Sequence, residues 1–190
     1  MAMRYDPGFK LLLSNAALIE GLLQDCIGED WIQHLDFATL EQVHIDAPSD
    51  DPHAGLNGTI WRLRWLRADS MRWLYVHLLP ASQALVAPWT GIWVLTQVGR
   101  LYQELIRQDL VHPGSQLPPV VPILLYDGGE PTAATCDLDD LIEPVPGLEP
   151  YQPRMRWLAI NEQRYYETAF RGARGIANSL LLAPMRSRLC

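Results

Sequence analysis

The stretch YVHLLPASQAL, residues 75–85, is where the sequence most clearly predicts a buried strand. Its first five residues are apolar apart from His77, which is typical of a strand covered on both faces. Pro80 and the small or polar residues after it then end the apolar run. A strand of this kind commonly carries a functional side chain, such as an acid, at its end. Here the end of the strand has Ala81, Ser82 and Gln83 and no acid.

The segments on either side of this strand predict an α/β fold. Upstream, TIWRLRW (59–65) alternates apolar residues with arginines, as in the half-exposed partner strand of a hairpin. Downstream, residues 88–110 show the apolar spacing of a long amphipathic helix, and VVPILLY (120–126) reads as a second buried strand. A buried strand reached through a long helix indicates a βαβ crossover, so we expect a mixed sheet with helices on its faces.

The two ends of the chain give further elements. Residues 6–28 have helical spacing, with Ser14 and Asn15 as a break or cap between two helices. A first strand is expected at 40–45 and a last one at 155–160, and the residues from about Tyr165 give a weaker helical pattern.

Length and composition predict one domain over residues 1–165 and a helical or poorly ordered tail over 166–190. No apolar run approaches the roughly 20 residues of a membrane span, and no secretory signal is apparent, so we expect a cytoplasmic protein without a membrane partner. The three cysteines are far apart and match no metal-binding spacing. The net charge of −7 argues against a general nucleic-acid coat protein, although a local arginine patch could contact phosphate.

Five segments between residues 5 and 165 occur in an order that is specific although each is short: YDPGFKLLLSN, DWIQHLDFATLEQV, VGRLYQELIRQ, LPPVVPILLYDGGEP and DLDDLIEPVPGLEPYQPRMRWLAINEQRY. Together they resemble the recombination-promoting nuclease (Rpn) family, also described as the YhgA-like transposase family, within the PD-(D/E)XK nuclease superfamily. The resemblance implies a restriction-endonuclease-like core of helix, three strands, long helix and strand, with a mixed central sheet.

The resemblance also implies a chemistry, which is metal-dependent cleavage of DNA linked to recombination. Such nucleases hold a divalent metal, usually Mg²⁺, with one acid on the second strand and another at the end of the third, where the pattern resembles Glu-x-Gln. Mg²⁺ suits this role because it binds carboxylates and keeps waters, one of which serves as the nucleophile.

Aligned without gaps, the two acid positions of the family fall on Gly58 and Ala81, and the Gln of the pattern falls on Gln83. The family's acid near the N-terminus matches Asp6, for which helix capping is the simpler role. We therefore predict a degenerate nuclease that has no intact catalytic site and no metal cofactor. If the alignment is right, Gly58→Asp with Ala81→Glu should raise divalent-metal binding.

Two alternatives to an inactive nuclease stay open. In the first, an active Mg²⁺-dependent enzyme draws on other acids, of which Asp50 and Asp51 are nearest to Gly58, about 25 Å away along an extended chain. In the second, the chain is a non-enzymatic module that binds DNA or a protein partner. Its many tryptophans also raise the hypothesis of self-association.

A group of arginines and tryptophans in the hairpin is the candidate nucleic-acid site. Arginines beside aromatic rings can contact phosphates while the rings stack on bases. The simpler interpretation is a half-exposed hairpin with solvated arginines and tryptophans in the core. The arginines concerned are Arg62, Arg64, Arg67 and Arg72.

Overall fold

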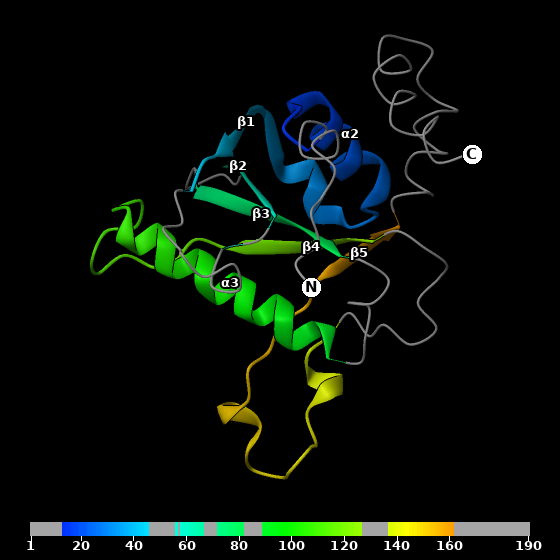
Figure 1. The fold of residues 1–190 in the computed structure, drawn as a ribbon, viewed down its shortest axis with the longest axis vertical. Helices are drawn as coiled ribbons and strands as arrows, with labels where there is room; N and C mark the ends of the chain where they lie inside the picture. Colours follow the sequence, from blue (N-terminus) through cyan, green and yellow to red (C-terminus); the bar gives the residue numbers. More distant parts are fainter. Residues whose placement is uncertain are drawn as a thin grey trace, which may run out of the picture.

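In the part of the chain that the structure describes, the fold is α/β, with two α-helices and a mixed five-stranded sheet in the order β1-β2-β3-β4-β5. A computed structural model of the chain describes residues 13–45, 56, 58–66, 72–81, 89–126 and 137–161. The two helices lie on opposite faces of the sheet (Figure 1). The elements are α2 (Ala16–Cys26), β1 (Leu35–Val43), β2 (Thr59–Trp65), β3 (Arg72–Ala81), α3 (Thr90–Arg107), β4 (Val120–Tyr126) and β5 (Leu158–Asn161).

The sheet combines an antiparallel half with a parallel half, which confirms the predicted mixed sheet. Strands β1, β2 and β3 pair antiparallel, and α3 then crosses over so that β4 runs parallel to β3. The predicted bounds of β4 are also correct. Within the antiparallel half, the register of β1 shifts between Asp36 and Glu41.

The bulge in β1 explains why the first strand begins earlier than the sequence predicts. The strand starts at Leu35 rather than Leu40, and its irregular part breaks the alternation on which a strand prediction depends. The hydroxyl of Thr39 repairs the ladder, because it accepts a hydrogen bond from the Arg64 backbone N–H at 2.8 Å and donates to the Asp36 carbonyl at 2.7 Å.

Helix α2 begins where the sequence predicts a cap. The Asn15 side-chain oxygen accepts from the backbone N–H of Ala17 at 3.0 Å, so a donor at the helix end is satisfied. The apolar residues Ile19, Leu22 and Leu23 of α2 recur at helical spacing and are buried against the sheet. The side of the sheet that they cover is called the α2 face below.

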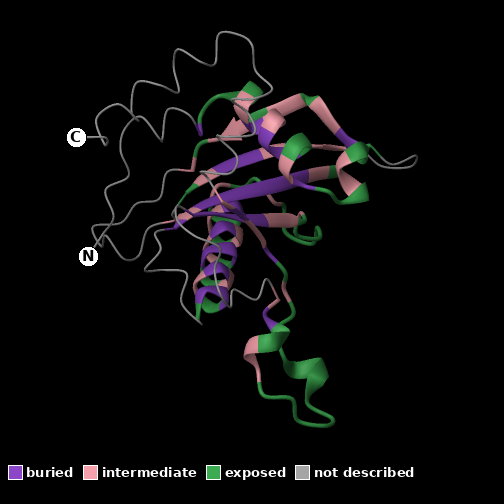
Figure 2. Cartoon of the chain, turned by 90° about the vertical axis from the view of Figure 1, so that its right-hand side faces the viewer, coloured by how far each residue is buried: buried purple, intermediate pink, exposed green. Residues whose placement is uncertain are grey.

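Strand β3 is the centre of the core, because every residue from Leu74 to Leu79 is buried (Figure 2). Its side chains alternate between the two faces. Leu74, Val76 and Leu78 pack on the α2 face, whereas Tyr75 and Leu79 pack on the opposite side, called the α3 face.

Residues 137–157 form an arm that projects from the body beyond α3 (Figures 1 and 2). Two short 3-10 turns, Asp139–Leu141 and Glu149–Tyr151, lie within it. Its base is anchored by Trp157, which is buried beside Leu138 against the start of α3. Among the described residues, no helix has the length and apolar character needed to cross a membrane.

Candidate functional site: a vacant acid pair and an arginine face

The two positions that the resemblance assigns to metal-binding acids lie at the same end of the sheet. Gly58 directly precedes β2, whose first residue, Thr59, pairs with Leu78. A Cβ atom on Gly58 would be 3.3 Å from the Pro80 ring, and Ala81 is the next residue. The fold therefore brings Gly58 close to the end of β3, as a site shared between these two strands requires.

Gly58 has no room for a side chain. Its φ is +92°, in the region that side chains rarely adopt, and an added Cβ would lie 2.0 Å from the carbonyl oxygen of Leu78. An acid at this position is therefore incompatible with the present backbone. The sequence-based expectation that Gly58→Asp with Ala81→Glu raises metal binding has to be revised, because the first change would disturb the start of β2.

Ala81 is part of the apolar core and only 2% exposed. A carboxylate at this position would lose its hydration among described neighbours that are apolar, which is costly. Its surroundings come from β3, β4, the first turns of α3 and the base of the arm. They are Leu79, Val94, Leu124, Leu138 and Trp157.

Three polar residues of the described strands lie toward this end of the sheet, and none of the three is an acid. His77 lies on the same face as Ala81, four residues earlier, and is fully buried between Ile60 and Pro122. Tyr126 pairs with Ala81, and Asn161 pairs with Tyr126. Sequence reasoning missed these two residues, although each is the last residue of its strand.

Several sequence-predicted residues lie outside the described part of the chain. These are Asp6, Gln83, Asp50, Asp51 and Arg67. In the part that is described, no three His, Cys, Asp or Glu side chains are arranged to hold a metal ion.

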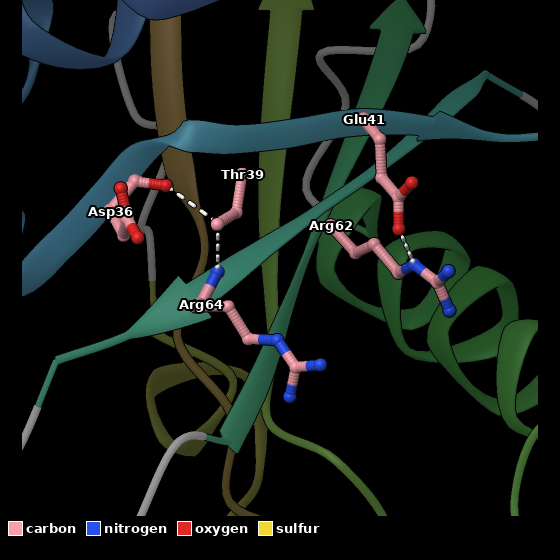
Figure 3. Close-up of polar contacts among 5 residues, drawn as sticks. All are labelled: Asp36, Thr39, Glu41, Arg62 and Arg64. Atoms are coloured by element: carbon pink, nitrogen blue, oxygen red, sulfur yellow. Dashed lines mark hydrogen bonds and ion pairs between the residues drawn. The ribbon is translucent and has the colours of Figure 1, made fainter.

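Arg62 and Arg64 of β2 lie together on the α3 face, where both pack against the ring of Trp73. The guanidinium carbon of Arg62 is 4.3 Å from the ring centroid and that of Arg64 is 3.7 Å from it. Both guanidinium groups lie on the same side of β2 (Figure 3). Cation–π contacts of this kind hold the two positive charges over one aromatic surface.

Glu41 on the neighbouring strand compensates one of these charges. Its carboxylate accepts from Nε of Arg62 at 2.5 Å (Figure 3). Burial alone lowers the pKa of Arg62, but hydrogen bonds to Tyr75 and Glu41 outweigh it, so the pKa lies above its usual value. Arg62 therefore stays charged and is held in place by its neighbours.

Arg72 does not belong to this arginine face. It pairs with Trp65 across the β2–β3 ladder, and directly opposite residues share a face of the sheet. Trp65 packs with the core on the α2 face, so Arg72 also lies on that side. The described part of the predicted group thus separates into Arg62 and Arg64 on one face and Arg72 on the other.

Comparison of the chain with protein-family models, curated proteins and solved structures finds no match to any of them. The relation to the Rpn family therefore rests on the sequence resemblance alone.

Proposed function

We propose that the chain is a degenerate relative of the Rpn or YhgA-like nucleases, which keeps the scaffold and has lost metal-dependent DNA cleavage. The order of α2, three strands, α3 and β4 supports a restriction-endonuclease-like core, because it is the order that the resemblance implies.

The packing of Ala81 is the observation that carries the proposal. Mg²⁺ needs carboxylate ligands at the strand ends, and in this chain that position holds a methyl group enclosed by apolar side chains. The backbone at Gly58 supports the same conclusion, since it excludes any side chain. Restoring one acid would not rebuild the site, because the second position has no space for it.

The direct test is incubation of the purified chain with supercoiled plasmid DNA and either Mg²⁺ or Mn²⁺. We expect the plasmid to stay intact over a range of protein concentrations. An Asp50→Ala, Asp51→Ala double variant purified in parallel serves as the matched control. Metal-dependent nicking by the natural chain that the double variant lacks would establish the active alternative. Equal nicking by both proteins would instead show that the cleavage does not depend on Asp50 and Asp51.

A second candidate function is DNA binding without cleavage, favoured by the position of Arg62 and Arg64 on Trp73. The two guanidinium groups held over this ring suit contact with a phosphate backbone, with one of their two charges compensated by Glu41. If the candidate is right, Arg62→Gln with Arg64→Gln should weaken binding of a labelled oligonucleotide and reduce its salt dependence. Arg154→Gln with Arg156→Gln on the arm removes the same charge from exposed side chains and is the matched control.

A further inference from the structure

A small cavity lies between β2 and the 3-10 turn η1 (Asp30–His34). Its volume is about 430 Å³, within the range of about 300–1,000 Å³ typical of small-molecule sites. The described residues that line it are two indoles, one imidazole and one carboxylate: Trp31, Trp65, His34 and Asp30. The cavity is distinct from the region around Gly58 and Ala81, because Trp65 is at the other end of β2.

The walls of this cavity are held in place by contacts with its surroundings. The indole N–H of Trp31 donates to the Glu29 carboxylate at 2.6 Å, which fixes the orientation of the ring. The His34 carbonyl accepts from the Leu66 backbone N–H at 2.7 Å, so the end of η1 is tied to the end of β2. The His34 ring also packs on Trp65, with centroids 5.6 Å apart.

The charge around the cavity favours a cation. Indole rings attract positive charge, the acidic residue Asp30 is among the lining residues, and Glu29 adds a second negative charge where it accepts from the indole N–H of Trp31. Arg62 and Arg64 lie on the opposite face of the sheet and do not offset these charges. Among the described residues, Arg72 is a competing cation on the same face, where it pairs with Trp65 but does not line the cavity.

We propose that this cavity binds a methylated ammonium group, with Trp31 and Trp65 contacting its methyl surface and Asp30 supplying the counter-charge. Quaternary ammonium groups suit such a site because they combine a positive charge with an apolar surface and donate no hydrogen bonds. The group could belong to a free small molecule such as choline or to a trimethylated lysine side chain. This inference does not depend on the proposed nuclease ancestry.

The experiment is calorimetric titration of the full chain with choline, with a trimethyllysine peptide, and with the neutral tert-butyl analogue of choline, in which carbon replaces nitrogen. We expect a cation to bind at least about tenfold more tightly than the neutral analogue. Tighter binding of the peptide would identify a protein tail as the source, whereas tighter binding of choline would identify a free metabolite. Equal affinity for choline and its neutral analogue, or no binding of either cation, would overturn the proposal.

Variants test the assigned roles. Asp30→Asn should weaken binding of the preferred cation about 5- to 30-fold, and so should Trp31→Ala. Asp139→Asn and Trp89→Ala, which change exposed residues far from the cavity, are the matched controls and should leave affinity unchanged. Removing the competing charge with Arg72→Gln should strengthen binding.

Unchanged affinity in Asp30→Asn would refute the counter-charge and with it the proposal. If Trp31→Ala does not fold, two measurements still test whether the cavity binds a cation. Asp30→Asn changes an exposed side chain, and the comparison of choline with its neutral analogue uses the natural chain.

Discussion

The backbone angle φ of Gly58 and the nearby Leu78 carbonyl together exclude any side chain at this position. We predict that Gly58→Ala lowers the free energy of unfolding by about 3 kcal/mol or more, because it adds a 2.0 Å contact to an unfavourable φ. Gly114→Ala is the matched control, since Gly114 also has a positive φ, of +86°, but nothing lies within 4 Å of its added Cβ. The control should lose only about 1 kcal/mol. Equal losses in chemical denaturation would show that the contact with Leu78 is not rigid.

At the same scale, the sequence predicted what is missing at the candidate site but not why it is missing. The amino-acid sequence by itself shows that position 81 is alanine and not an acid. The enclosure of Ala81 by Val94 and Trp157 depends on residues far away in the chain, and the backbone angle of Gly58 depends on its approach to Leu78. The placement of Arg72 likewise needed the register of the hairpin, because a shift of one residue moves a side chain to the other face.

At the scale of elements, the contact between α3 and the arm requires a small residue at one helix position. A Cβ on Gly91 would lie 2.8 Å from the side chains of both Leu141 and Trp157. We predict that Gly91→Ala lowers the free energy of unfolding by about 1–3 kcal/mol through overpacking. Gly99→Ala, on the exposed side of the same helix, should instead raise it by about 1 kcal/mol, since its Cβ meets nothing. Thermal unfolding of both variants checks the opposite signs, and two gains would mean that the arm moves aside freely.

The elements that could be predicted best are those whose spacing of apolar and capping residues lies within the element itself. The apolar spacing of α3 and the uninterrupted run of β4 each identify one element, as does the Asn15 cap of α2. The start of β1 could not be predicted, because its bulge depends on a hydroxyl of Thr39 that bonds to the neighbouring strand. The cavity beside η1 was also missed, since Trp31 and Trp65 are far apart in the sequence and meet only through the fold.

For the whole molecule, the two ends of the β2–β3 hairpin have different proposed roles. The end of β3 that the resemblance assigns to catalysis is part of the apolar core, and its side chains join α3 and the arm to the sheet. The opposite end of the β2–β3 hairpin carries the polar and aromatic groups, with Arg62 and Arg64 on one face and the cavity by Trp65 on the other. The two proposals are independent of each other, because the first concerns Gly58 before β2 and the second concerns Trp65 at the far end of the same strand.

Alkaline pH should destabilise the whole fold partly through Tyr102 of α3. Its hydroxyl donates to the Pro118 carbonyl at 3.1 Å, and burial raises the pKa of the phenol above its ordinary value of 10.0. As the pH rises, the phenol therefore loses its proton in the unfolded chain before it does so in the folded chain. The contribution of the protonated phenol to the free energy of unfolding is complete below pH 10.0 and is lost as the pH rises through the folded-state pKa. We predict that the natural chain is more stable than Tyr102→Phe near neutral pH and that this difference shrinks above pH 10.0.

Denaturant unfolding of both proteins across this pH range measures the difference in the free energy of unfolding. Tyr151→Phe, on the exposed arm, is the control variant and should leave that free energy unchanged. A difference that stays constant with pH would show that the buried phenol does not titrate with unfolding.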